Sequence, residues 1–137
     1  MAARRRLGLG ERLHLAGWRR DIPAVMDALD VLVLTSLHEG LPRVVPGAMA
    51  RGRAVVATAV DGTPEAITEG ETGCLVAPGD IDGMARRVTW LLQDPLRGKR
   101  LGEAARERVG EFDIDHMVRR QEQLYDGLMA QKNGEAA

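Results

Sequence analysis

Residues 30–35 contain four consecutive valine and leucine residues with no polar side chain among them. A strand with one face in water alternates apolar and polar residues, so this unbroken run predicts a strand buried on both faces, as in parallel sheets. Two further apolar runs, at 54–58 and 73–77, and an alternating run at 12–16 predict three more strands. We therefore expect a sheet of about four strands.

Helical patterns lie between the predicted strands. Short helices are expected over 22–29 and 64–68, and a third opens at Gly40 and Pro42 and stops at Gly52. Alternation of strands and helices with short connections implies an α/β fold with a mostly parallel sheet flanked by helices.

Aspartates mark the starts of further helices. The expected assignments are Asp21 as N-cap of the helix over 22–29, Asp80 as N-cap of a helix over 81–93, Asp94 with Pro95 at the start of a helix to about 109, and Asp113 as N-cap of the last helix. We expect residues 131–137 to fray, and the whole chain, 1–137, to form a single domain with a helical C-terminal tail.

The composition excludes several classes of protein. Apolar residues make up 45% and charged residues 28%, which is typical of a soluble globular domain and not of a disordered chain. The net charge of -1 provides no field that favours nucleic acid. No apolar run approaches the roughly 18 residues of a membrane span, and no signal peptide is recognised. A single cysteine excludes an internal disulfide and suits a reducing compartment, so a cytoplasmic location is expected.

Ligands of parallel sheets bind beyond the carboxyl ends of the strands, so a site is expected in the loops that follow them. The loop over 36–42 leads into a helix whose N-terminus favours an anion such as phosphate. Gly40 would let the backbone approach a ligand, and Glu39 could accept hydrogen bonds from hydroxyl groups. The loop predicts a phosphorylated polyhydroxy ligand such as a nucleotide sugar; a plain turn with a solvated glutamate is the alternative.

Two other loops are weaker candidates. The loop over 60–65 could approach a ligand, or it could be a tight turn with Thr63 as N-cap of the next helix. In the loop over 17–21, Trp18 and its neighbouring arginines could stack on a nucleobase, or the tryptophan could pack against its neighbours.

Other chemistry finds little support in the sequence. The three histidines, His14, His38 and His116, share no metal-ligand spacing with Cys74, so no metal site is expected. Cys74 lies in an apolar run and is expected in the core. Motifs of serine hydrolases, P-loop proteins and dinucleotide-binding proteins are not found, and no catalytic residue can be named.

The loop motifs together carry a resemblance to a known family. They include Leu15-Ala16-Gly17-Trp18, Ser36-Leu37-His38-Glu39-Gly40-Leu41-Pro42, Ala48-Met49-Ala50-Arg51-Gly52, Asp61-Gly62-Thr63-Pro64-Glu65 and Gly73-Cys74-Leu75-Val76-Ala77-Pro78-Gly79-Asp80. In order and spacing, over roughly residues 7–130, the series resembles the C-terminal, nucleotide-sugar-binding domain of GT-B glycosyltransferases of the family-4, group 1 type.

The resemblance implies a partial Rossmann-like sheet and transfer of a sugar from a nucleoside diphosphate sugar to an acceptor, without a metal or other cofactor. The residues that it assigns to the donor sugar and diphosphate are Glu39, Gly40, Leu41, Pro42 and Arg43. Those that it places along the base are Gly17, Trp18 and Arg19.

Three departures from the family qualify this expectation. The second glutamate of the family, which binds the ribose hydroxyls, is replaced here by Gly47, which follows Pro46. One glycine of a usual pair is Asp61, which brings a negative charge near the expected phosphates. No acceptor domain is found, nor the first strands of the donor domain. We therefore expect a donor-binding part that cannot transfer a sugar alone; the alternatives are a non-catalytic nucleotide-binding module and a remnant without a ligand.

The missing strands also predict an uncovered sheet edge. In the family they separate the strand that matches 12–16 from the strand that matches 31–35. Without them, an apolar edge at 31–34 is an association hazard. The expected partners are therefore a nucleotide sugar or nucleoside diphosphate and, through this edge, a second copy of the chain or a complementing chain.

Overall fold

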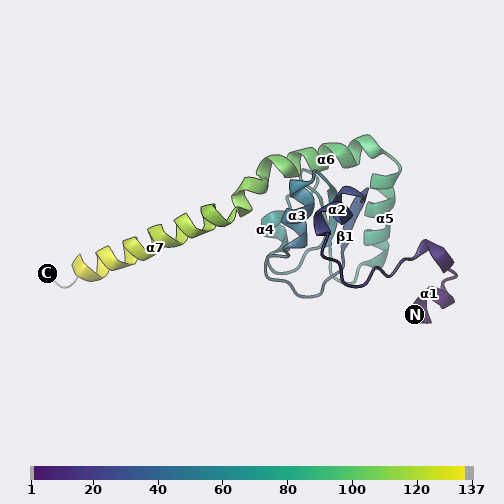
Figure 1. The fold of residues 1–137 in the computed structure, drawn as a ribbon, viewed down its shortest axis with the longest axis horizontal. Coiled ribbons are helices and arrows are strands. Elements are labelled where there is room, and N and C mark those ends of the chain that lie inside the picture. The colour runs from purple at the N-terminus through teal and green to yellow at the C-terminus, as the bar shows by residue number, and fades with distance from the viewer. Residues whose placement is uncertain (1, 135–137) are drawn as a thin grey trace.

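A three-stranded parallel sheet is the centre of the computed structural model, which describes residues 2–134 (Figure 1). The strands lie in the order β1-β2-β3. The elements along the chain are α1 (Ala2–Arg6), the 3-10 helix η1 (Gly10–Arg12), α2 (Ile22–Asp27), β1 (Val31–Leu34), α3 (Val44–Ala50), β2 (Ala54–Thr58), α4 (Thr63–Ala66), β3 (Cys74–Val76), α5 (Ile81–Leu92), α6 (Pro95–Arg108), the 3-10 helix η2 (Val109–Phe112) and α7 (Ile114–Gly134).

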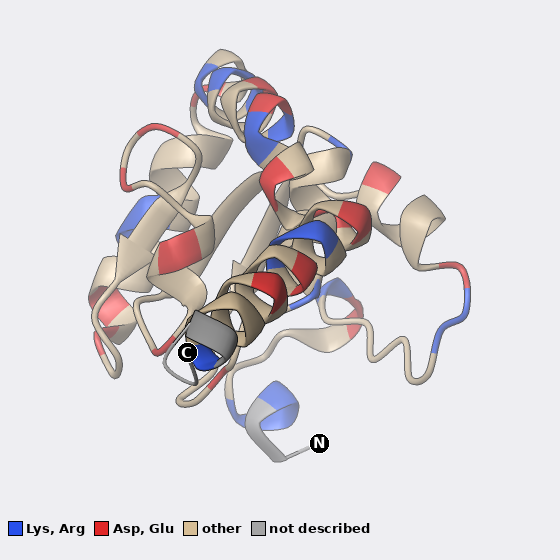
Figure 2. Ribbon diagram, turned by 90° about the vertical axis from the view of Figure 1, so that its left-hand side faces the viewer, with Lys and Arg blue, Asp and Glu red and all other residues tan. Residues whose placement is uncertain are grey.

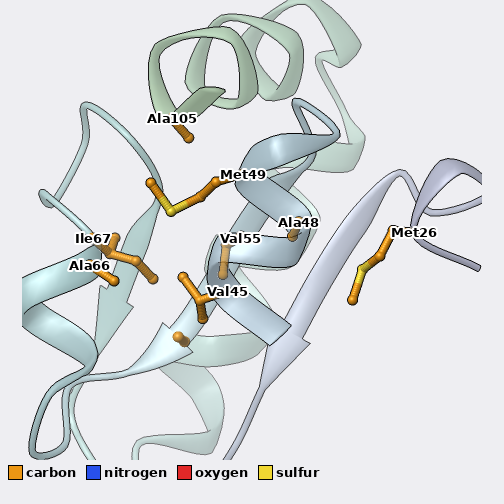
Figure 3. Packing of buried hydrophobic residues seen from close by; sticks show 9 residues of the cluster. Met26, Val45, Ala48, Met49, Val55, Ala66, Ile67 and Ala105 are labelled. Carbon is orange, nitrogen blue, oxygen red and sulfur yellow. The ribbon is translucent and has the colours of Figure 1, made fainter. Parts of the chain in front are cut away.

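The core lies on both faces of β2, all five residues of which are buried. On one face Val55 packs with Val45 and Met49 of α3, and Ala105 of α6 closes this cluster (Figure 3). On the other face the buried residues include Leu91 of α5. A strand between two helix layers has no polar face, which explains the unbroken apolar runs in the sequence.

The run at 12–16 is not a strand, so that prediction is wrong. Arg12 ends a 3-10 helix, and residues 14–20 are exposed and irregular. A strand needs a hydrogen-bonded neighbour, and within residues 2–134 β1, at one edge of the sheet, pairs only with β2. The predicted α/β class is confirmed, with three strands in place of about four.

The predicted helices all form, but their caps differ. Asp80 accepts a hydrogen bond from the backbone N–H of Gly83, and Asp113 accepts one from that of Asp115 at 2.8 Å, as predicted. Asp21 makes no cap bond because its carboxylate pairs with Arg19. Of the tail expected to fray, residues 131–134 continue α7, and 135–137 lie outside the described residues.

Close backbone contact joins α6 to the turn before β2. Gly52 ends α3 at a φ of 62° and lies against Gly102, where an added Cβ would collide with the Gly52 carbonyl oxygen. The left-handed φ explains why glycine stops this helix, as the sequence predicted.

The last helix, α7, extends away from the sheet (Figure 1). Basic and acidic residues are mixed along it (Figure 2). Its apolar stripe is exposed and comprises Ile114, Met117, Val118, Leu124, Tyr125, Leu128 and Met129. Within the described part of the chain, none of the helices combines the length and apolar character needed to cross a bilayer.

The single cysteine lies in the core, as expected. Cys74 of β3 is fully buried, and burial, followed by the nearby Glu69 carboxylate, raises the pKa of its thiol. A buried thiol that ionises with difficulty is a poor nucleophile.

The cap of α5 gives a stability prediction. Asp80→Ala removes the acceptor for the Gly83 N–H and is expected to lower the free energy of unfolding by about 1 kcal/mol in a urea titration. Asp21→Ala is the matched control, because Asp21 occupies an N-cap position without a cap bond and its removal should leave the unfolding midpoint unchanged. Equal midpoints for the two variants would contradict the assigned caps.

Candidate functional site

Two loops meet beyond the carboxyl ends of β1 and β2. One runs over 36–42 and the other over 59–62. Their backbones touch at Gly62, where an added Cβ would collide with the carbonyl oxygen of Gly40. Only glycine permits this approach, so the second loop supports the first.

Asp61 ties the two loops together. Its Oδ2 accepts a hydrogen bond of 2.8 Å from the backbone N–H of Glu39, and His38 Nδ1 lies 3.7 Å from the same oxygen. Asp61 has a φ of 43°, a left-handed conformation that aspartate tolerates better than most residues. The aspartate that replaces a glycine of the family motif therefore holds the backbone of the neighbouring loop.

The Glu39 side chain is held from within its own loop. The Ser36 hydroxyl donates a hydrogen bond of 2.6 Å to Glu39 Oε1, and the Thr58 hydroxyl donates one of 2.5 Å to the Ser36 carbonyl. Sequence reasoning assigned no role to either hydroxyl residue, and no sequence signal of this loop pointed to their hydrogen bonds. Among residues 2–134 no hydrogen bond reaches Glu39 Oε2, so this oxygen can accept one from a ligand.

The other residues expected at the donor follow Glu39 along the loop. Gly40 is exposed, with open space where a Cβ would stand; Leu41 and Arg43 are also exposed, and Pro42 is buried. The helix begins at Val44 and not at Pro42, because a turn closed by the Val45 N–H and the Pro42 carbonyl precedes it.

The position of the absent ribose glutamate is open. Gly47 lies in α3, and nothing stands within 4 Å of a Cβ added there. Pro46 is the third residue of this helix, in the first turn, where an N–H is not needed for an intrahelical bond. The proline therefore does not break the helix, and a glutamate side chain has room at Gly47.

The residues expected along the base form a separate group. Trp18 is 90% exposed, so packing against its neighbours is excluded for the described residues. Arg19 Nε donates a hydrogen bond of 2.8 Å to Asp21, which lowers the pKa of that carboxyl. Within residues 2–134 no hydrogen bond or ion pair joins the segment 17–21 to the loop over 36–42.

Two further expectations concern Thr63 and a metal. Gly62 and not Thr63 is the N-cap of α4; Thr63 is fully buried in the helix itself, so its hydroxyl caps nothing. Across the described part of the chain, the histidine, cysteine and carboxylate side chains form no group of three that could hold a metal ion.

Comparison with known proteins identifies the family to which this chain is similar. The family model described as "Glycosyl transferases group 1" matches residues 1–94. The lipopolysaccharide core biosynthesis glycosyltransferase LpsE of Rhizobium meliloti (strain 1021) is 36% identical over 107 residues, which are 77% of this chain and 32% of LpsE. The chain thus spans about a third of the length of this curated relative.

Solved structures agree with the sequence match. HepE of Anabaena in complex with UDP aligns with a TM-score of 0.83 and 30% identity, over 94% of this chain and 35% of HepE. The C-terminal domain of the group 1 glycosyl transferase LpcC of Francisella tularensis aligns with a TM-score of 0.72 and 26% identity, over 82% of this chain and 60% of that domain.

The loop contact at Asp61 gives a second stability prediction. Asp61→Ala loses the acceptor for the Glu39 N–H and puts alanine at a left-handed φ, so the free energy of unfolding should fall by about 1–2 kcal/mol. Asp61→Asn keeps an acceptor oxygen and tolerates the conformation, so it should stay within about 0.5 kcal/mol of the unsubstituted protein. The measurement is urea unfolding, and a loss in Asp61→Asn as large as that in Asp61→Ala would show that the hydrogen bond and the φ angle are not the cause.

Proposed function

We propose that this chain, which belongs to the group 1 glycosyl transferases, binds the nucleoside diphosphate sugar from which such an enzyme takes its sugar. The observation that carries the proposal is the Glu39 carboxylate, held by Ser36 beside the exposed Gly40 backbone at the carboxyl edge of a parallel sheet. Ligands of this fold class bind at that edge. HepE, to which the chain is similar, was solved with UDP and with UDP-glucose.

The roles follow from the chemistry of each group. Glu39 accepts hydrogen bonds from donor-sugar hydroxyls with Oε2, while Ser36 fixes its Oε1. The backbone at Gly40 and Leu41 and the Arg43 side chain face the sugar and diphosphate. The positive Arg43 side chain and these backbone N–H groups would stabilise the charge that develops on the leaving diphosphate. The exposed Trp18, with Gly17 and Arg19, is assigned to the nucleobase.

Transfer itself is proposed to need more than this chain provides. The matched segment is about a third of LpsE, and no described residue can be assigned as an acceptor site. Gly47 favours a second candidate function, a module that binds a nucleotide or nucleotide sugar without transferring it, because a glycine offers no carboxylate to the ribose. Donor binding is common to both candidates.

Titration calorimetry with UDP and UDP-glucose tests donor binding. We expect UDP-glucose to bind with a dissociation constant below about 1 mM. Glu39→Ala should weaken this binding about tenfold, or by about 1.4 kcal/mol, because the sugar hydroxyls lose their hydrogen bonds to the charged carboxylate. UDP, which lacks the sugar, should be weakened much less by this substitution. Binding should be the same with a chelator as with added Mg²⁺.

Glu103→Ala is the matched control, because Glu103 is an exposed glutamate of α6. It pairs with Lys99, which lines a hollow at the opposite ends of the strands with Val31 and Ala54. This substitution should leave both affinities unchanged. Absence of heat with either ligand, or an equal effect of Glu39→Ala on UDP and UDP-glucose, would contradict the role given to Glu39.

The ribose position gives a separate prediction. Gly47→Glu introduces a carboxylate where a Cβ meets nothing within 4 Å, and glutamate favours a helix more than glycine does. We expect UDP to bind several-fold more tightly, measured by the same titration. Gly47→Gln controls for helix propensity, and an equal gain in both variants would show that the charge plays no part.

A further inference from the structure

A hollow of about 490 Å³ lies where the outer edge of β3 meets α5. Its size is that of a small-molecule site, and it shares no residue with the loops over 36–42 and 59–62. Among the residues that the structure describes, β3 pairs only with β2, so no strand lies beside this edge of the sheet. Polar groups of the strand and of the helix line the hollow, and none of them belongs to the proposed donor site.

The backbone of β3 offers an acceptor to the hollow at Leu75. The Leu75 N–H donates a hydrogen bond of 2.5 Å to Glu69 Oε2, so it points away from β2. In an extended strand the C=O of a residue lies on the same side as its N–H, so the Leu75 carbonyl also points outward. A carbonyl oxygen in this position can accept a hydrogen bond from a hydroxyl group.

Two arginines of α5 bring donors to the same hollow. The Arg86 side chain is 72% exposed, and its Nη2 lies 3.9 Å from Asp80 Oδ2, which is too far for a hydrogen bond. Arg87 pairs with Oε1 of Glu69, the carboxylate whose Oε2 accepts from the Leu75 N–H. Each guanidinium therefore has a carboxylate beside it, so the hollow offers hydrogen-bond donors and acceptors with little net charge.

The hollow also has an aromatic wall. Trp90 lines it, one helical turn after Arg86. The Arg97 guanidinium lies 4.1 Å from the centroid of the Trp90 ring and donates a hydrogen bond of 2.6 Å to the Trp90 carbonyl, and Asp94 pairs with Arg97 at 3.2 Å. The indole is thus held in place from α6, while the residue remains 37% exposed. A ring fixed in this way can pack against a ligand with little loss of side-chain freedom.

We propose that this hollow binds a neutral saccharide. A sugar ring has an apolar C–H face, which packs on Trp90, and a rim of hydroxyl groups. These hydroxyls donate to the Leu75 carbonyl and to Asp80 Oδ2, and they accept from the Arg86 guanidinium. A phosphorylated or carboxylated sugar fits less well, because Asp80 and Glu69 already balance the two guanidinium groups of α5.

The hollow opens at the same end of the sheet as the proposed donor site. Ala77 and Asp80, which line it, follow the carboxyl end of β3, as the loop over 36–42 follows that of β1. The two strands are two strand spacings apart, or about 10 Å. An oligosaccharide anchored on Trp90 can therefore extend toward this loop, which suits a glycan that accepts the donor sugar. This last step rests on the proposed function.

NMR of the indole N–H signals tests the site, because Trp18 and Trp90 are the two tryptophans of the chain. The probes are neutral hexasaccharides of glucose, of mannose and of N-acetylglucosamine, each added without nucleotide. We expect at least one of them to shift the Trp90 signal, with a dissociation constant of about 1 mM, and to leave the Trp18 signal unchanged. Arg86→Ala should weaken this binding about fivefold, the value of one hydrogen bond. Trp90→Leu, followed through the Leu75 amide signal, should weaken it at least about tenfold.

Arg100→Ala is the matched control, because Arg100 is an exposed arginine of α6 that does not line the hollow. It should bind the saccharide as the unsubstituted chain does, and circular dichroism checks that each variant is folded. The proposal is overturned if none of the three probes shifts the Trp90 signal, or if Arg86→Ala and Trp90→Leu leave the binding unchanged. Tighter binding of hexagalacturonate, an anionic chain, than of every neutral probe also overturns it.

The two proposed sites can fail separately. Glu39→Ala should bind the saccharide normally, since Glu39 does not line the hollow. Binding of UDP-glucose without any response of Trp90 to the saccharides would refute the saccharide site alone. A saccharide response in a chain that binds neither UDP nor UDP-glucose would refute the donor site alone.

Discussion

The burial of β2 on both faces is the constraint on which the rest of the structure depends. Ala54–Thr58 pair with a parallel strand on each side and pack under α3 on one face and α5 on the other. Thr58, at the carboxyl end, donates its hydroxyl to the Ser36 carbonyl, and Asp61, three residues later, holds the Glu39 N–H. The core strand thus sets the position of the loop to which donor binding is assigned.

Local signals in the sequence were enough for most of the fold. The three unbroken apolar runs became the three strands, and Gly52 and Asp80 ended and began the helices where expected. The prediction of a strand at 12–16 was wrong because a strand depends on its neighbour as well as on its own pattern. In the part of the chain that the structure describes, β1 pairs with β2 alone. The prediction that Asp21 caps a helix was wrong because its carboxylate pairs with Arg19 instead.

In the candidate site too, some features could be predicted from the sequence and others could not. Glu39 and Gly40 could be singled out from the loop pattern, since a glycine and a glutamate before a helix have recognisable chemistry. Contacts between loops could not, because the hydrogen bond from the Glu39 N–H to Asp61 joins residues 22 positions apart in the sequence. Asp61 was expected only to add charge near phosphates; the structure shows it supporting the backbone that would meet them.

The central claim is that the loop beyond β1 contacts the donor. The most direct test is to follow the backbone amide signals of the folded chain by NMR while UDP-glucose is added. The account predicts that the largest shifts occur at Glu39, Gly40 and Leu41, with smaller ones at Trp18. Shifts concentrated at the opposite ends of the strands, around Gly52 and Lys99, or no shifts at saturating ligand, would contradict it.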